Sequence, residues 1–289
     1  MFQSLSDSSA RLTWFDIAGK EIGQIGGTGY FEPRLSPDGH DLAVASDDER
    51  NGRSVIRVLD FTRGISSRLT DGGYEGSPAW SPDSRRITYR TVDALTEVPA
   101  DGSGPAQVLL KGEAYLGHLD WSVDGQLVFT VFSGDSTSLE VYSTADRKVM
   151  PFGLGGEARF SPDGKWIAYV GPLSEPGSDA IFIAPFRGPG GHIRVSSGSA
   201  AQPTWAHDGR RLFYVAPDRK LMMVEFDPRT KSASAPRVLF QSRIIAPNFS
   251  ATQYAVSRDD HFLINSFPAN SSSPLTLITG WTATIEKPK

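Results

Sequence analysis

The sequence of 289 residues contains no cysteine. This absence excludes disulfide bridges, thiolate metal sites and a cysteine nucleophile, although it does not fix the cellular compartment. Long apolar runs are also missing, since no stretch approaches the ~20 residues that a membrane-spanning helix needs. The N-terminus lacks the basic and apolar segments of a signal peptide, so neither a cleaved leader nor membrane insertion is expected for this chain.

Positive charge is scarce, because the formal net charge is −4 at pH 7. A basic surface that binds the phosphates of nucleic acid is therefore not expected. Known catalytic motifs are missing as well: the sequence has no G-x-S-x-G nucleophile elbow, no H-E-x-x-H and no G-x-x-x-x-G-K-[ST] loop. The five histidines are scattered, and His40, His207 and His261 lie in or beside turns, where solvated side chains are expected.

Glycine and proline, in contrast, are frequent, with 29 and 20 residues. Such a composition disfavours long helices and favours short strands joined by turns. A four-residue motif then recurs along the chain, with its Asp repeated at intervals of 39 to 51 residues. The first copy reads Ser-Pro-Asp-Gly, and the six copies stand at 36–39, 81–84, 122–125, 161–164, 206–209 and 257–260. Repetition at this period is typical of stacked or radial repeat architectures.

Each copy of the motif has the composition of a tight turn between two strands. Proline presets φ at the second position, aspartate bonds to nearby backbone, and glycine accepts a positive φ. Ser84 and Asp260 replace this glycine in two copies. The six motif aspartates are therefore interpreted as turn residues and not as metal ligands. A bulky residue precedes every motif, namely Leu35, Trp80, Trp121, Phe160, Trp205 and Val256.

The repeat predicts an all-β fold with six four-stranded antiparallel sheets. Because one such sheet cannot stand alone, radial stacking that buries both of its faces is favoured, and the bulky residues would then pack between sheets. A six-bladed β-propeller over residues 1–289, as one domain, is expected. Strand-like segments at 12–17 and 21–25 would join the last blade and close the ring. Residues 275–278, with Trp281, are either the third strand of that blade or an added edge strand.

These repeats resemble the WD-repeat-like propellers of the TolB-like class, in which Pro-Asp replaces Trp-Asp. The resemblance covers about residues 11 to 285. Segments 12–21, 217–222 and 274–283 are similar to the propeller that ends many bacterial eukaryotic-like serine/threonine kinases. This resemblance implies a sensor or interaction module without catalytic residues, fused to or derived from a kinase-containing protein. It also implies an extracytoplasmic location where a membrane anchor is present.

The innermost strands carry the candidate site in two rows. Four residues before each motif stand Glu32, Ser77, His118, Glu157, Gln202 and Gln253. Two residues before each motif stand Arg34, Ala79, Asp120, Arg159, Thr204 and Ala255. Strand alternation predicts that both rows share one face and line a central channel. Blades 1 and 4, which are opposite in a six-fold ring, both carry Glu-x-Arg.

The channel has two interpretations. It is either a water-filled channel of mutually satisfied polar groups, or a ligand site in which Arg34 and Arg159 bind an anion or a peptide terminus. A metal held by Glu32, His118 and Glu157 is less favoured, since two arginines would oppose it, and no cofactor is expected. Loops around the funnel are expected to expose aromatic residues just before innermost strands, which could anchor a partner, namely Tyr30, Phe31, Tyr74 and Tyr115.

The leading hypothesis is therefore a non-catalytic module that binds a protein, peptide or small ligand in its funnel and loops. The alternative is a propeller hydrolase or lyase, whose general base would come from Glu32, His118, Asp120 or Glu157. A purely structural scaffold is the third option.

Overall fold

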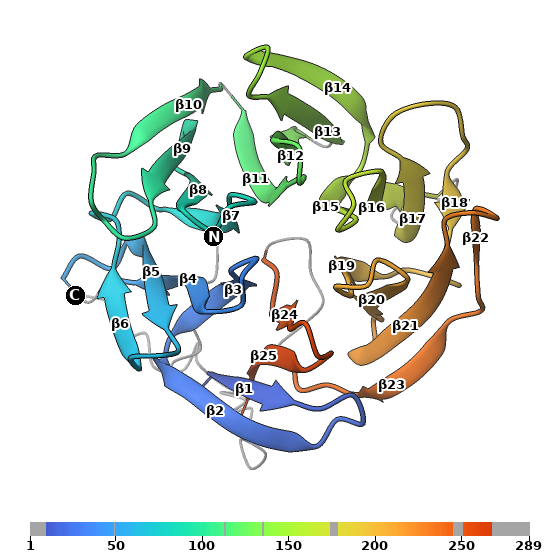
Figure 1. Ribbon diagram of the computed structural model, residues 1–289, viewed down its shortest axis with the longest axis horizontal. Coiled ribbons are helices and arrows are strands. Elements are labelled where there is room, and N and C mark those ends of the chain that lie inside the picture. Colours follow the sequence, from blue (N-terminus) through green and yellow to red (C-terminus); the bar gives the residue numbers. More distant parts are fainter. Residues whose placement is uncertain are drawn as a thin grey trace, which may run out of the picture.

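Six antiparallel sheets surround a central axis in the computed structural model of the protein (Figure 1). The structure describes residues 10–48, 50–112, 114–134, 136–173, 179–244 and 251–267. Among them every regular element is a strand, and no helix that could cross a membrane occurs. The predicted all-β six-bladed propeller is thus confirmed.

The first three blades follow one another along the chain. Blade 1 contains β3 (Tyr30–Leu35), β4 (Asp41–Asp47), β5 (Ser54–Asp60) and β6 (Ile65–Arg68). Blade 2 contains β7 (Gly76–Trp80), β8 (Arg86–Arg90), β9 (Ala94–Pro99) and β10 (Gln107–Lys111). Blade 3 contains β11 (Tyr115–Trp121), β12 (Gln126–Ser133), β13 (Ser136–Ser143) and β14 (Lys148–Leu154). In each blade the strands pair in chain order from the axis outward.

The next two blades repeat this order, with one variation. Blade 4 contains β15 (Gly156–Phe160), β16 (Trp166–Pro172), β17 (Asp179–Pro185) and β18 (Ile193–Arg194). Blade 5 contains β19 (Ala201–Trp205), β20 (Arg211–Val215), β21 (Lys220–Asp227), β22 (Ser232–Ala233) and β23 (Arg237–Gln241). The outer edge of β21 is shared between β22 and β23, so this sheet has five strands.

Blade 6 joins the two ends of the described chain, as the sequence predicted. It contains β24 (Tyr254–Val256), β25 (Phe262–Ser266), β1 (Arg11–Phe15) and β2 (Glu21–Thr28). β1 pairs with β25 from Arg11 opposite Ser266 to Phe15 opposite Phe262, and β2 forms the outer edge. The third-strand position considered for residues 275–278 is therefore occupied by β1. Those residues and Trp281 lie outside the described part of the chain.

The hydrophobic core consists of six clusters, one between each pair of neighbouring blades. One cluster packs Ala43 and Ile56 of blade 1 against Trp80 and Ile87 of blade 2. The indole Nε1 of Trp80 also donates to the backbone carbonyl of Arg34 at 2.8 Å. The bulky residues that precede the motifs therefore join neighbouring blades, as predicted.

The motif turns have the predicted hydrogen bonds. In the first copy the Ser36 hydroxyl donates to Asp38 Oδ1 at 2.6 Å, and that oxygen accepts the backbone N–H of His40 at 3.1 Å. The two residues that replace glycine still adopt the left-handed conformation, with φ of 59° at Ser84 and 60° at Asp260. Ser84 Oγ accepts the backbone N–H of Asp38 at 3.1 Å, so this turn is held by the neighbouring blade.

Candidate functional site

A β-bulge interrupts five of the six innermost strands at the first row of candidate residues. In β3, for example, the pairing register shifts between Phe31 and Arg34. The bulged residues have left-handed backbone with φ between 49° and 59°, namely Glu32, Ser77, His118, Glu157 and Gln202. Because a bulge reverses the alternation of side chains, the two rows do not continue one face of the strand.

Residues of the first row make hydrogen bonds from blade to blade. Glu32 accepts the backbone N–H of Ser77 at 2.6 Å and the Ser77 hydroxyl at 3.2 Å. Ser77 Oγ accepts the backbone N–H of His118 at 3.3 Å. These bonds link the innermost strands of blades 1, 2 and 3.

The same arrangement links the other half of the ring. Glu157 Oε2 accepts the backbone N–H of Gln202 at 2.5 Å, and Gln202 Oε1 accepts that of Gln253 at 2.8 Å. All six residues of the row are buried. Their hydrogen bonds give the first row a structural role at the axis, and a ligand-binding role for it stays a prediction.

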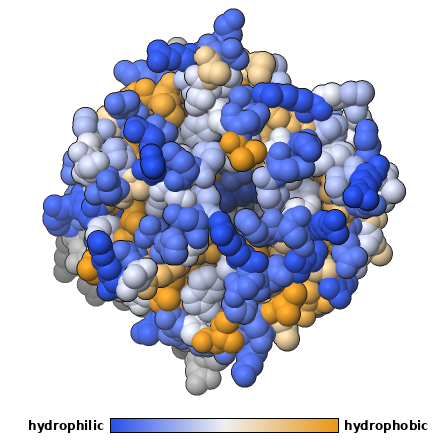
Figure 2. All heavy atoms as spheres, viewed as in Figure 1, coloured by the Kyte–Doolittle hydropathy of each residue, from blue (hydrophilic) through white to orange (hydrophobic). Residues whose placement is uncertain are grey.

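The second row surrounds a funnel of about 740 Å³ at the face that carries the motif turns. Four of its six members line this funnel, namely Arg34, Asp120, Arg159 and Thr204. The other two, Ala79 and Ala255, are buried near the axis without lining it. Figure 2 shows a central hollow surrounded largely by hydrophilic residues.

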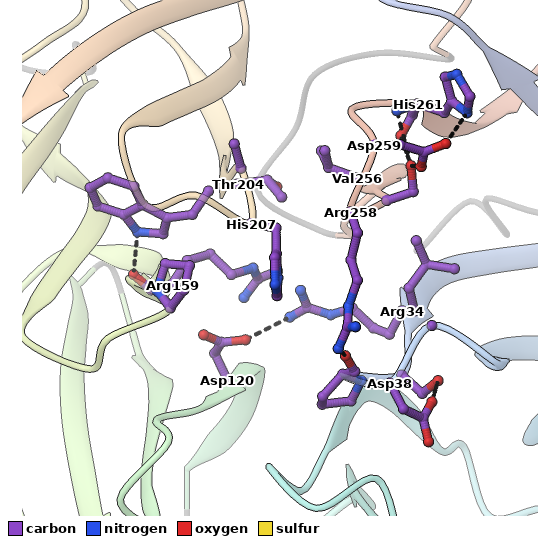
Figure 3. A pocket seen from close by; sticks show the side chains of 18 of the residues that line it. Arg34, Asp38, Asp120, Arg159, Thr204, His207, Val256, Arg258, Asp259 and His261 are labelled. Atoms are coloured by element: carbon purple, nitrogen blue, oxygen red, sulfur yellow. Dashed lines mark hydrogen bonds and ion pairs between the residues drawn. The ribbon is translucent and has the colours of Figure 1, made fainter.

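Two arginines from opposite blades converge at the floor of the funnel (Figure 3). Arg34 Nη2 donates to the backbone carbonyl of Leu119 at 2.7 Å, and Arg159 Nη1 contacts the same oxygen at 3.4 Å. Arg159 also donates to Thr252 Oγ1 at 2.7 Å. The Nε–H of Arg159 is buried and has no hydrogen-bond partner, which leaves one donor at the floor unsatisfied.

Asp120 is the acidic group beside these two cations. Its Oδ1 lies 4.0 Å from Arg34 Nη2, and its Oδ2 accepts the backbone N–H of Phe160 at 2.8 Å. Burial raises the pKa of Asp120, although both arginines act in the opposite direction. Burial and the charge of Arg159 lower the pKa of Arg34 to about 9, which still leaves a cation at neutral pH. Two arginines and one carboxylate therefore line the floor, and the carboxylates of Glu32 and Glu157, which do not line the funnel, also act on Arg159.

The mouth of the funnel is formed by residues of the motif turns. His207, Arg258 and His261 line it, and Arg258 reaches across to donate to the Pro37 carbonyl of blade 1. His261 Nδ1 lies 3.1 Å from Asp259. Sequence reasoning regarded the two histidines as solvated turn residues and did not select Arg258. Their positions in turns that encircle the axis are the signal that identifies them.

The predicted aromatic anchors lie on the opposite face from the funnel mouth, because they precede the innermost strands and the motifs follow them. Tyr74 and Tyr115 are 55% and 47% exposed. The guanidinium of Arg53 lies 5.4 Å from the ring centre of Tyr74, and that of Arg90 lies 4.5 Å from the ring centre of Tyr115. Tyr30 and Phe31, in contrast, pack against the inter-blade clusters.

A metal centre is not evident in the described part of the chain, where no group of three or more His, Cys, Asp or Glu side chains could hold an ion. The trio of Glu32, His118 and Glu157 that sequence reasoning considered for a metal does not form such a group. Glu32 instead bonds to Ser77, and Glu157 bonds to Gln202.

Comparison with known proteins gives one match by sequence and several by structure. No family model matches the chain. An uncharacterized peptidase, YuxL of Bacillus subtilis, is 31% identical over 156 residues, and the match covers 50% of this chain and 22% of that protein. The chain therefore spans about a fifth of the length of this relative.

Among solved structures, a putative TolB from Agrobacterium tumefaciens superposes with a TM-score of 0.69 at 17% identity, covering 90% of this chain and 99% of that one. An oligogalacturonate lyase from Vibrio parahaemolyticus has a TM-score of 0.58 at 13% identity, covering 90% of this chain and 91% of that one. At such low identity these likenesses establish the fold and not the activity. The resemblance to kinase-linked propellers stays a prediction. The chain thus has the six-bladed β-propeller fold of the TolB structures.

Proposed function

We propose that the protein is a non-catalytic binding propeller whose funnel accepts the carboxylate of a peptide, above all a C-terminus. The observation that carries this proposal is the meeting of Arg34 and Arg159 at one carbonyl oxygen, with the Asp120 carboxylate beside them. An anionic group would be attracted by the two guanidinium groups, and the buried Arg159 Nε–H would supply a hydrogen bond to it. The cavity is large enough for several residues of an extended peptide.

Binding of a tetra-alanine peptide with a free C-terminus, compared with the same peptide amidated, tests the proposal. We expect the free acid to bind more tightly, because the amide has lost the charge that the arginines recognise. Arg34→Ala and Arg159→Ala should each weaken binding about tenfold or more, as expected for a charge-assisted hydrogen bond. Equal binding of the two peptides would contradict the proposal.

Arg85→Ala is the matched control, because Arg85 is an exposed arginine beside the motif of blade 2 and does not line the funnel. Arg159→Lys is a second informative variant. It keeps the positive charge but removes the planar guanidinium, so binding should fall between that of the wild type and Arg159→Ala. Circular dichroism of each variant establishes that the propeller is intact.

A lyase or hydrolase that uses the same funnel is the second candidate function. It is favoured by the sequence match to a peptidase and by the fold shared with an oligogalacturonate lyase. Galacturonate units carry carboxylates, which Arg34 and Arg159 could neutralise, and Asp120 or His207 would be the nearest general base. Incubation with oligogalacturonate, followed by ultraviolet absorbance of the unsaturated product, distinguishes this candidate from binding alone. Product formation that Asp120→Asn abolishes would favour the enzyme.

A further inference from the structure

A second pocket of about 470 Å³ lies between blades 3 and 4. Its walls come from β11, the ends of β12, β14 and β16, and the starts of β13, β15 and β17. The motif turns lie at the other end of β11 and β12, so this pocket opens on the face opposite the funnel mouth. None of the residues of the funnel lines it.

The inner end of this pocket holds an unsatisfied carboxylate oxygen. Glu157 is 2% exposed, and its Oε2 accepts the Gln202 N–H, whereas its Oε1 is buried without a hydrogen-bond partner. Leaving a buried acceptor of this kind unpaired costs free energy, so a ligand, an ion or a proton is expected beside it. Burial raises the pKa of Glu157 to about 7, with Asp179 acting in the same direction.

Asp179, at the start of β17, supplies a second carboxylate to the same pocket. Burial raises the pKa of Asp179 as well. The other charged or titratable groups toward Glu157 are His118 of β11, Arg159 of its own strand and Tyr254 of β24. Arg159 is committed to the funnel floor through Leu119, Ala158 and Thr252. Two acidic groups therefore face a cavity whose described lining contains no lysine or arginine.

The remaining lining is largely apolar, with Phe132 and Val170 in the walls and Leu154, 64% exposed, at the edge. Thr130, Ser136 and Thr137 also line the pocket. A divalent metal would need more ligands than two carboxylates supply. An ammonium group needs three acceptors at most, and its carbon chain would cover the apolar wall.

We propose that this pocket binds a primary ammonium group on a short aliphatic chain. Glu157 Oε1 and the Asp179 carboxylate accept its hydrogen bonds, and Phe132 and Leu154 contact the chain. The same pocket would receive a lysine side chain or a small amine with equal chemistry. This site shares no lining residue with the carboxylate site proposed for the funnel.

Titration of the intact protein with butylammonium chloride, and with butanol as its neutral counterpart, tests this assignment. Calorimetry and ligand-observed NMR should show saturable binding of the amine and at least tenfold weaker binding of the alcohol. Glu157→Gln and Asp179→Asn should each weaken amine binding about tenfold or more, since each removes a charged acceptor. At pH 7 binding should also release protons, because the cation favours the ionised form of Glu157.

Glu140→Gln is the matched control, since Glu140 lies on β13 of blade 3, which contributes to the pocket wall, but does not itself line the pocket. Its affinity for butylammonium should equal that of the wild type. Equal affinity for amine and alcohol, or amine binding that survives both Glu157→Gln and Asp179→Asn, would overturn the assignment. Absence of saturable binding would also overturn it and would leave Glu157 as a protonated structural residue. The affinity of the funnel for the tetra-alanine peptide should be unchanged in Asp179→Asn. Failure of one proposal can therefore be distinguished from failure of the other.

Discussion

Glu157 shows how much one side chain contributes to pH-dependent stability in this fold. Its pKa rises from an ordinary value of 4.5 to about 7, chiefly because burial disfavours the charged form. Between these two values the folded state holds a proton that the unfolded state has released. The free energy of unfolding therefore falls as pH rises through this range, by up to roughly 1.4 kcal/mol per pH unit.

Glu157→Gln should remove this dependence, since glutamine keeps the acceptor for the Gln202 N–H but does not titrate. Relative to the wild type, the variant is expected to gain on the order of 2 kcal/mol between pH 5 and pH 8. Urea unfolding of both proteins at the two pH values measures the difference. A difference that is the same at pH 5 and pH 8 would show that Glu157 is ionised in the folded protein throughout.

The motif turn of blade 2 is an element in which backbone strain and a hydrogen bond oppose each other. Ser84 has a φ of 59°, and its hydroxyl accepts the N–H of Asp38 from blade 1. Ser84→Ala should lose about 1 kcal/mol of stability, because the bond disappears and the strain stays. Ser84→Gly loses the same bond but relieves about 1 kcal/mol of left-handed strain, so it should remain near the wild type. Thermal unfolding of the two variants measures this difference in stability. A Ser84→Ala variant that is more stable than Ser84→Gly would contradict the prediction.

The bulges show which elements could not be predicted from the sequence. Turn positions were predictable, because proline and glycine have local conformational preferences that do not depend on the rest of the fold. Glutamate has no such preference for positive φ, yet Glu32 and Glu157 adopt it. A side chain from one blade bonds the backbone of the next, and this tertiary contact accompanies each bulge in Glu32, Ser77, Glu157 and Gln202. Strand alternation alone therefore assigned both rows to one face.

At the scale of the whole molecule, six repeats predicted the number of blades and the closure of the ring, because each sheet needs a neighbour on both faces. The number of blades also made the arginine pair predictable, because blades 1 and 4, which carry Arg34 and Arg159, are opposite in a six-fold ring. The residues that line the funnel mouth, in contrast, could not be predicted from the repeats. Whether His207 and Arg258 face solvent or the axis depends on the tilt of the blades, which no local pattern of residues determines.

Closure of the ring is the last feature that can be tested by a single substitution. Leu12 on β1 is fully buried in the cluster between blades 6 and 1, together with Leu42 and Leu263. If the N-terminal strands close the propeller, Leu12→Ala should lower the free energy of unfolding by about 2–5 kcal/mol, as truncation of a core leucine usually does. Leu127→Ala, in the cluster between blades 2 and 3, should cost a similar amount, because every inter-blade interface is then equivalent.

Ile22→Ala provides the comparison within blade 6, because Ile22 on β2 is 46% exposed. This substitution should lower the free energy of unfolding by no more than about 0.5 kcal/mol. Urea unfolding followed by tryptophan fluorescence and by circular dichroism measures all three variants. Coincident transitions are expected, because a ring without a free end has no blade that can unfold independently of its neighbours. A small loss of stability for Leu12→Ala beside a large one for Leu127→Ala would mean that β1 contributes little to a propeller stabilised by the other blades. Pairing of the N-terminal strands with the last blade would then not be needed for the stability of the ring.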